Sequence, residues 1–445
     1  MGLPPANYKR LIVLCDGTWQ SILNVNTPSH PSNVARFARA ISPVAVVKDK
    51  DGEKEVEQII YYQPGVGTGL GDQIRGGVYG AGLSANIRAA YAFLAHNYDS
   101  NGSDPNVKGD EIFFFGFSRG AYTARSIAGL VSKLGLLTKR GMDWFPQVYD
   151  EYYKDASKKP DFNFSDSLKK CIGNDINEKA KDAIRIVGVW DTVEFHGEGW
   201  GGEKIEFHNA ELSRRVQYAY HALSLDERRM PYTPTLWQWP TVKDSNNRSQ
   251  LYKPVYGTGL QVFKQAWFSG VHSDIGGGRY DPGGSDITLA WMLAQCSKDK
   301  KLAFIDEDSD DYYLLPDKSN PNPNTKWARL RNKFEAEPKE GIASSITSKI
   351  QELAMDDRRA WPMENTFERI HRSIRDRDHE KWPCGMLTGD EVKPGLWELV
   401  HGGKFGHRHE LPELEPDPVA DAIEDKYRGR IRALPGSKGG PSSKM

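Results

Sequence analysis

The feature that most constrains this chain is an aromatic run that leads directly into a serine between two glycines. Residues 113–117 read FFFGF, and Ser118, Arg119 and Gly120 follow at once. From Gly116 onward the letters fit G-x-S-x-G, a pattern in which the serine lies on a sharp turn between a strand and a helix. Glycines two positions to either side avoid clashes in that strained turn. The pattern predicts a nucleophile elbow at Ser118, and the alternative is an ordinary turn that ends a strand.

Short apolar runs alternate with helical segments as far as about residue 298. The runs predict strands at residues 10–15, 57–62, 111–115, 184–190 and 265–271, and the intervening spacing predicts helices at 33–41, 83–97 and after the serine. Strands separated by helices indicate a mostly parallel sheet with helices on both faces. The predicted fold class is therefore α/β. Asn33 is the expected N-cap of the first helix.

Changes in composition divide the chain into three predicted parts. Residues 8–298 form the α/β core, and residues 299–414 form a helical insertion or C-terminal subdomain, helical or irregular, that packs on it. Residues 415–445 are polar and rich in Gly, Pro and Ser towards the end, which predicts a mostly disordered tail.

The net charge of -1 argues against a nucleic-acid-binding protein, because binding needs an excess of cations to neutralise phosphates. The sequence has neither an apolar run long enough to span a membrane nor a secretory signal, so we expect an intracellular, cytoplasmic protein. Transient contact with a membrane surface remains compatible with this. The last residues, Ser443, Lys444 and Met445, resemble a peroxisomal import signal, and the alternative is an ordinary polar tail.

A serine nucleophile needs a base, and the base needs an orienting acid. Asp191 directly follows the apolar run at 184–190, and His272 follows the run at 265–271. The carboxyl ends of parallel strands meet at one edge of a sheet, so we expect both side chains to meet Ser118 there. Asp226 and Asp274 are competing acids, and structural alternatives are a buried histidine at 272 and a helix cap at 191.

An oxyanion hole needs two backbone N–H donors. Arg119, directly after the nucleophile, is the expected first donor, and Gly17 or Thr18 after the first strand is the expected second. Asp16 is unexpected at this place, because a carboxylate repels an oxyanion. It is expected to fix its loop by accepting backbone hydrogen bonds, or to pair with Arg119.

The remaining motifs indicate neither a metal nor a cofactor. The glycine-rich stretch at 65–82 does not fit a phosphate-binding loop, and it is interpreted as a flexible wall of the site. The acidic cluster at 306–311 lacks the spacing of an EF-hand. Arg228 or its neighbour Arg229 is a candidate anion clamp near the site, and local ion pairs at a helix end are the structural alternative.

Several segments together resemble a known family of α/β-hydrolase domains related to type VI secretion phospholipase effectors. They are LCDGTW (14–19), PGVGTG (64–69), FFGFSRGAYTAR (114–125), VGVWDTV (187–193), HALSLDERRMPYTPTLW (221–237), WFSGVHSDIGGGRY (267–280) and ERIHRSIRDR (368–377). The resemblance covers roughly residues 8–380. It implies an α/β-hydrolase fold, a triad of Ser118, Asp191 and His272, and esterase or phospholipase chemistry on acyl esters.

The function predicted from the sequence is a serine hydrolase that cleaves a carboxylic ester of a small molecule or a lipid, without a cofactor. Because the chain lacks the large membrane-docking extensions of the effectors, a soluble acyl ester or an acyl thioester is an alternative substrate. Two alternatives come from other classes. One is an inactive hydrolase scaffold that binds a ligand or partner. The other is a metal-dependent phosphoesterase that uses Asp16 and Asp274.

Overall fold

A computed structural model represents the whole chain. It describes residues 3–17, 31–65, 79–102, 108–155, 164–193, 210–227, 229, 232–244, 248–253, 259–278, 283–305, 367–372, 391–393, 396–400 and 408–432.

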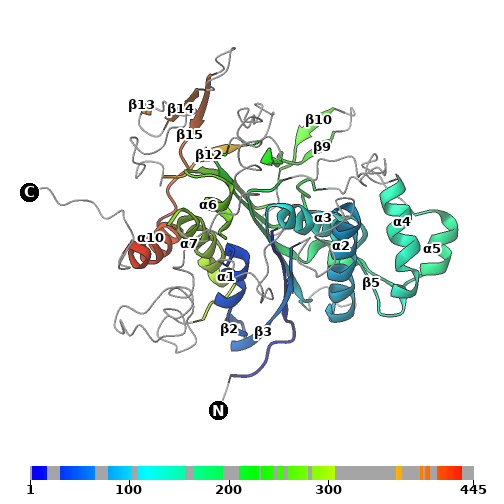
Figure 1. Cartoon of the computed structure of the whole chain (residues 1–445). Coiled ribbons are helices and arrows are strands. Elements are labelled where there is room, and N and C mark those ends of the chain that lie inside the picture. The colour runs from blue at the N-terminus through cyan, green and yellow to red at the C-terminus, as the bar shows by residue number, and fades with distance from the viewer. Residues whose placement is uncertain are drawn as a thin grey trace, which may run out of the picture.

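A mostly parallel sheet of eight strands forms the centre of the described structure, in the order β12-β11-β8-β7-β4-β1-β3-β2 (Figure 1). Its strands are β1 (Arg10–Cys15), β2 (Val44–Asp49), β3 (Gly52–Gln63), β4 (Glu111–Phe117), β7 (Ile184–Trp190), β8 (Tyr218–Ser224), β11 (Val262–Phe268) and β12 (Glu368–Ile370). Every neighbouring pair is parallel except β2 and β3, which form an antiparallel hairpin at one edge. The carboxyl ends of β4, β7, β8 and β11 therefore lie along one edge of the sheet.

The central strands β1, β4 and β7 are buried on both sides, which explains why they read as continuous apolar runs rather than as alternating patterns. Along β1 the side chains of Leu11 and Val13 belong to one hydrophobic cluster, and those of Ile12 and Leu14 belong to the other. Successive side chains of a strand point to opposite faces, so one apolar strand serves two cores. The predicted α/β class is thereby confirmed.

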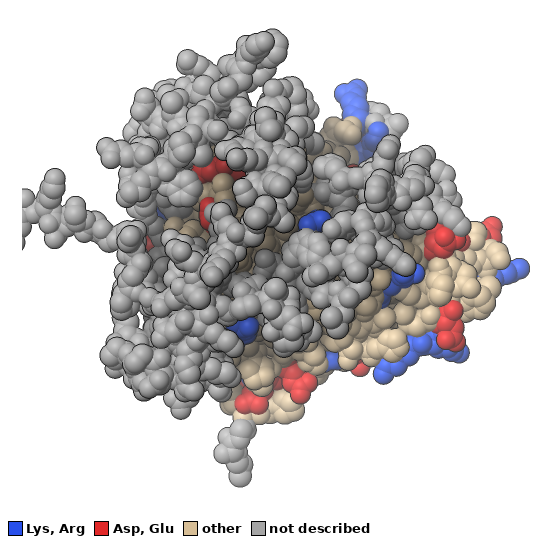
Figure 2. Space-filling view, in the orientation of Figure 1, with Lys and Arg blue, Asp and Glu red and all other residues tan. Residues whose placement is uncertain are grey.

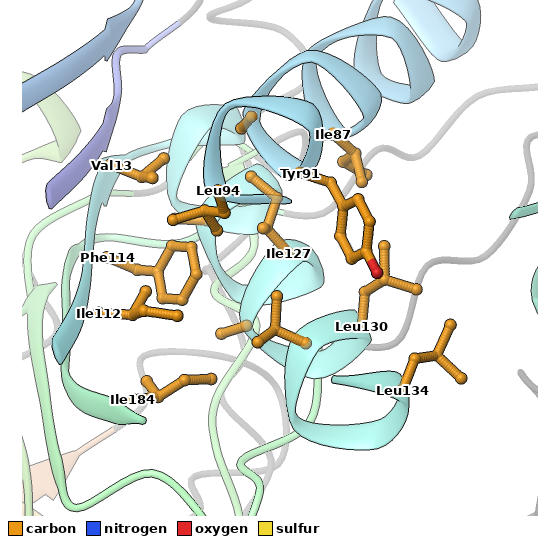
Figure 3. Packing of buried hydrophobic residues seen from close by; sticks show 14 of the residues in the cluster. Val13, Ile87, Tyr91, Leu94, Ile112, Phe114, Ile127, Leu130, Leu134 and Ile184 are labelled. Carbon is orange, nitrogen blue, oxygen red and sulfur yellow. The ribbon is translucent and has the colours of Figure 1, made fainter. Parts of the chain in front are cut away.

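Helices cover both faces of the sheet (Figure 1). The first face carries α2 (Tyr79–Asn97), α3 (Arg119–Leu134) and α4 (Phe145–Asp155), and Figure 3 shows α2 and α3 side chains packed on Val13, Ile112 and Phe114. The second face carries α1 (Asn33–Ala40) and α7 (Gly283–Ser297), and α10 (Pro418–Arg432) packs beside α7. The remaining described elements are β5 (Leu136–Leu137), η2 (Gly141–Trp144), α5 (Asp166–Ile172), β6 (Ile176–Asn177), η4 (Glu178–Asp182), β9 (Thr241–Lys243), β10 (Ser249–Leu251), α6 (His272–Gly276), η6 (Lys298–Lys300), β13 (Glu391–Lys393), β14 (Leu396–Val400) and β15 (Arg408–Pro412).

Two local predictions need correction. Asn33 was the expected N-cap of the first helix, but Ser32 caps it, with its hydroxyl accepting from the amide of Ala35 at 3.1 Å. Asn33 instead donates its side-chain amide to the carbonyls of Ile275 and Ser285, and so ties α1 to α6 and α7. The segment that begins at His221 was interpreted as a helix end. Its first residues, 221–224, instead form the end of β8. This strand lies inside the sheet, but its alternation of Tyr, Ala and His does not read as an apolar run.

The C-terminal third also differs from prediction where it is described. Within 299–414 the described regular elements include the strands β12 to β15, so this part is not simply helical. Residues 418–432 form α10, although the sequence placed them in a disordered tail. Ala420 and Glu424 are both buried, which shows that this helix has an inward face. The boundaries of the three parts stay predictions.

Two further features concern membrane-spanning helices and the distribution of surface charge. Among the described helices, none is both long and apolar enough to cross a membrane. Over the described residues visible in Figure 2, acidic and basic side chains lie interspersed rather than sorted by sign.

Glu368 provides a test of how β12 is held against the sheet. The residue is 5% exposed, and burial raises the pKa of this carboxyl to about 7, although the neighbouring Trp267 opposes the shift. The folded protein keeps a proton that the unfolded chain releases near pH 4.5. Glu368 therefore costs no stability below that pH, and the cost grows as the pH rises towards 7. We expect Glu368→Gln to exceed wild type in free energy of unfolding by roughly 3 kcal/mol at about pH 8, and to gain nothing at about pH 4.

Urea unfolding at both pH values measures this difference. The exposed Glu57, on β3, gives a matched control, and Glu57→Gln should follow the wild-type curve at both pH values. Equal stability of Glu368→Gln and wild type at the higher pH would contradict the raised pKa of Glu368.

Candidate active site

Ser118 lies on the turn between β4 and α3, as the sequence predicted. Its backbone has φ 58° and ψ -127°, a conformation that a residue with a side chain rarely adopts. The amide of Ser118 donates to the carbonyl of Trp190 at 3.0 Å, which fixes the turn against the end of β7. The turn holds the hydroxyl at the carboxyl edge of the sheet, at the first turn of α3.

The two flanking glycines are required by close backbone contacts. A Cβ at Gly116 would lie 2.5 Å from the carbonyl oxygen of Gly120. A Cβ at Gly120 would lie 2.2 Å from the carbonyl oxygen of Asp16 and 2.3 Å from that of Cys15. Because these obstacles are backbone atoms, no side-chain rotation relieves them. The glycines let α3 start directly against the end of β1.

The side chains of Ser118, His272 and Asp191 form a continuous hydrogen-bonded line. Ser118 Oγ lies 2.8 Å from His272 Nε2, and His272 Nδ1 lies 2.6 Å from Asp191 Oδ2. All three are buried, with 5%, 4% and 0% of their surfaces exposed, respectively. The three residues come from the ends of β4, β11 and β7, so the convergence predicted from the strand ends is what the structure contains.

Asp191 is held by a residue that the sequence analysis did not single out. The amide and hydroxyl of Ser224, at the end of β8, donate to Asp191 Oδ1 and Oδ2 at 2.9 and 2.8 Å. Thr192, the residue after Asp191, donates its amide to His221 Nε2 at 3.2 Å. The other ring nitrogen, His221 Nδ1, lies 2.9 Å from the side-chain oxygen of Gln265. His221 is thus a buried histidine that accepts through Nε2 and fixes the turn after β7.

The two competing acids occupy other places. Asp226 accepts from the amide of Gly270 at 2.7 Å, and Asp274 accepts from the amide of Val271 at 2.9 Å. Both carboxylates therefore hold the backbone of the loop before His272 rather than its ring. The geometry selects Asp191 as the partner of the imidazole.

Only part of the predicted oxyanion hole is described. Arg119 is the first residue of α3, where backbone N–H groups of a helix favour negative charge. Gly17 donates its amide to Asp16 Oδ1 at 2.7 Å, a contact that competes with the expected role of Gly17 as a donor to the substrate. Thr18 lies outside the described residues, so the second donor stays a prediction.

Asp16 fixes its own loop, which is one of the two roles expected of it. Besides Gly17, it accepts from the hydroxyl of Tyr62 at 2.5 Å. Burial raises the pKa of Asp16, although hydrogen bonds from Tyr62, Ser32 and Gly17 oppose the shift. The carboxylate is thus engaged at the end of β1 and the neighbouring strand β3.

Arg228, the predicted anion clamp, lies outside the described residues, whereas its neighbour Arg229 lies beside the site. Arg229 forms an ion pair with Glu227, whose side chain is 2% exposed. Among the described residues, no group of three or more His, Cys, Asp or Glu side chains is placed to hold a metal ion. What the arrangement can do chemically is pass a proton from a hydroxyl to an imidazole that a buried carboxylate orients.

The glycine constraint gives a test of the elbow. We expect Gly120→Ala to lower the free energy of unfolding by about 1–3 kcal/mol or more, because the methyl group would force α3 away from the end of β1. Chemical denaturation measures the change. Gly109→Ala is the control, since a Cβ at Gly109 would lie 3.3 Å from its nearest neighbours and needs only a small shift. An equal effect of the two substitutions would contradict the role assigned to Gly120.

The chain is similar to proteins from yeast and bacteria. "Uncharacterized protein YEL023C" of Saccharomyces cerevisiae is 29% identical over 211 residues, covering 41% of this chain and 29% of the yeast protein, so the chain spans under a third of that relative. The crystal structure of an uncharacterized protein from Pseudomonas aeruginosa matches at 17% identity, with 65% of this chain and 46% of that one covered and a TM-score of 0.35. The Tle1 effector bound to the VgrG spike of the type 6 secretion system also matches at 17% identity, with 62% and 52% covered and a TM-score of 0.33.

A family comparison covers a larger part of the chain. Residues 9–295 match the catalytic domain of Tle1-like phospholipase effectors of the type VI secretion system. This range includes well over half of the sequence and contains Ser118, Asp191 and His272. The chain therefore belongs to the family of Tle1-like phospholipase effector catalytic domains.

Proposed function

We propose that this protein is a serine hydrolase of the α/β-hydrolase fold, which cleaves a carboxylic ester of a lipid through an acyl-enzyme at Ser118. The observation that carries the proposal is the hydrogen-bonded line from Ser118 Oγ through His272 to Asp191 Oδ2. The mostly parallel sheet with helices on both faces and the serine on a strand-to-helix turn support the fold assignment.

In the first half of the reaction, Ser118 Oγ attacks the carbonyl carbon of the ester. Its proton passes to His272 Nε2, which lies 2.8 Å away. Negative charge develops on the carbonyl oxygen, and the amide of Arg119 at the start of α3 is the expected donor to it. When the tetrahedral intermediate collapses, the carbon–oxygen bond to the alcohol breaks, and the proton on Nε2 passes to the leaving alkoxide. The acyl group stays on Ser118.

In the second half, water takes the place of the alcohol. His272 Nε2 removes a proton from the water as its oxygen attacks the acyl carbon, and the same proton returns to Ser118 Oγ when the acid leaves. Asp191 serves both halves, because its carboxylate accepts from His272 Nδ1 and stabilises the imidazolium that forms twice per cycle. The hydrogen bonds from Ser224 keep that carboxylate oriented.

Membership in a family of phospholipase effector catalytic domains favours a lipid acyl ester as the substrate. The acyl chain length and the head group are open within this proposal, and a soluble acyl ester or thioester is the alternative. The cytoplasmic or peroxisomal location stays a prediction, since Ser443, Lys444 and Met445 lie outside the described residues.

The two alternative classes have less support. A metal-dependent phosphoesterase would need the carboxylates of Asp16 and Asp274 for metal binding, but both already accept hydrogen bonds from the protein, Asp16 from Gly17 and Tyr62 and Asp274 from Val271. An inactive scaffold has no need of a serine, a histidine and an aspartate in hydrogen-bonding order. Chelation separates the first alternative from the proposal, and covalent labelling separates the second.

A fluorophosphonate probe tests the nucleophile. We expect wild type to be labelled and Ser118→Ala to lose all labelling, because the probe reacts with an activated serine hydroxyl. The same variant should lower the hydrolysis of acyl esters by at least about 10⁴-fold. Chelator should leave wild-type hydrolysis unchanged.

Ser126→Ala is a matched control. Ser126 is a buried serine on α3, the helix that follows Ser118, and its hydroxyl donates to the carbonyl of Tyr122 at 2.8 Å, so its substitution should leave labelling intact. Well-folded wild type that takes up no probe and hydrolyses no ester would reject the hydrolase in favour of a binding scaffold. Activity lost to chelator would favour the phosphoesterase.

A further inference from the structure

The backbone before His272 is held by a series of carboxylates. The loop leaves β11 at Phe268, turns at Gly270 with φ 116°, and enters α6 at His272. The amides of Gly270 and Val271 donate to Asp226 and Asp274, and the amide of His272 donates to Glu227 Oε2 at 3.2 Å. Of these three carboxylates, Glu227 is the one bonded to the residue that carries the base.

Glu227 is an anion held on several sides. Its side chain is 2% exposed, and Arg229 binds it with Nε and a terminal nitrogen at 2.8 and 2.7 Å, in the forked geometry that suits a carboxylate. The amide of Arg229 donates to it as well, at 2.9 Å. Burial alone would raise the pKa of Glu227, but these hydrogen bonds and the charge of Arg229 outweigh burial and lower it.

Arg229 leads back to the ring of His272 through Tyr232. The guanidinium carbon lies 3.9 Å from the centre of the Tyr232 ring, a cation–π distance. The Tyr232 ring centre lies 4.7 Å from that of His272, and Phe117 contacts the imidazole at the same centre-to-centre distance. The contacts therefore close a cycle that runs from the His272 amide through Glu227, Arg229 and Tyr232 to the His272 ring.

We propose that Glu227, Arg229 and Tyr232 form a brace that positions His272 and sets its proton affinity, a role that rests on the proposed function of Ser118. These are positioning residues, because they act on the imidazole rather than on the substrate. The brace fixes His272 from two directions: Glu227 holds its backbone, and Tyr232 packs on its ring. A base fixed in this way keeps Nε2 aimed at Ser118 without reorganisation during the reaction.

The pairing of Arg229 favours the brace over a substrate clamp. An arginine that recognises a phosphate or carboxylate of a substrate presents its fork to that group. Arg229 directs its Nε and a terminal nitrogen at Glu227, and its planar face at Tyr232. The guanidinium therefore joins two groups of the protein itself.

The brace predicts an electrostatic effect as well as a geometric one. Among the described residues, the charged or titratable groups around His272 are Asp191 after β7, Asp226, Glu227 and Arg229 after β8, Tyr232, and Asp274 on α6. The anion of Glu227 stabilises the imidazolium. Removing the charge of Glu227 takes away this stabilising anion and also leaves the cation of Arg229 without its anionic partner. Both effects disfavour a positive charge on His272 and so lower its proton affinity.

Glu227→Gln tests the brace, because it keeps the size of the side chain but removes its charge. We expect kcat to fall about tenfold with KM within about twofold, since a displaced base affects turnover rather than binding. The acidic limb of kcat/KM, which reports the protonation of the base, should move down by about half a pH unit or more. Tyr232→Leu should lower kcat in the same way, whereas Tyr232→Phe, which keeps the ring, should retain most of the turnover.

Glu111→Gln is the matched control for a lost buried ion pair. Glu111 has a side chain 5% exposed and pairs with Arg10 and Arg185 at the opposite end of the sheet, at the start of β4. The substitution Glu111→Gln should lower the stability of the protein without moving the pH profile of kcat/KM. The proposal is overturned if Glu227→Gln leaves the profile in place, or if Tyr232→Leu turns over substrate like wild type.

A measurement that needs no substrate tests the brace independently of the proposed hydrolase activity. In protein with carbon-13-labelled histidine rings, NMR gives the titration of His272, assigned by its loss in His272→Gln. Glu227→Gln should titrate at lower pH than wild type, and an unchanged titration overturns the brace. This shift should occur even if wild type neither takes up the fluorophosphonate probe nor hydrolyses an ester, results that would reject the proposed function alone.

Discussion

The buried carboxylate of Asp191 imposes the strictest demand on this structure. Asp191 is fully buried, with 0% of its surface exposed. A charge that is removed from water is tolerated only when hydrogen bonds satisfy it. Ser224 and His272 supply those bonds, and they come from the ends of β8 and β11. The demand therefore extends to the order of strands, because β7, β8 and β11 must be neighbours for the carboxylate to be satisfied. The sheet has them in that order.

The end of β8 consequently serves two members of the site. Ser224 holds Asp191, and Asp226 and Glu227, two and three residues further on, hold the loop that leads to His272. A strand that lies between β7, which leads to Asp191, and β11, which leads to His272, is well suited to this, because its last residues reach both sides. The distance between Asp191 and His272 is thus set by a third strand, in addition to their mutual hydrogen bond.

The sequence alone predicted the features that depend on local pattern and strand polarity. The elbow at Ser118 is a local pattern, and the meeting of Asp191 and His272 follows from the rule that parallel strands end at one edge. The sequence could not reveal β8 as a central strand, because its alternation of Tyr, Ala and His lacks the continuous apolar run of its neighbours. Without that strand, Ser224 and Glu227 had no predictable place beside Asp191 and His272. Likewise, α10 was missed because its surroundings are polar and its inward face is narrow, with Ala420 and Glu424 among its buried residues.

The contrast between Asp16 and Asp191 shows that a buried carboxylate at a strand end need not contact a histidine. Both follow parallel strands directly, and both are buried. Asp191 meets an imidazole, whereas Asp16 meets the Gly17 amide and the Tyr62 hydroxyl, which are neutral donors. Neutral donors satisfy a carboxylate but do not couple it to a proton that moves. The difference lies in the neighbouring strand: β1 has β3 beside it, which contributes a tyrosine. Asp191 follows β7, and the next two strands of the sheet, β8 and β11, contribute Ser224 and His272, of which the histidine also contacts Ser118.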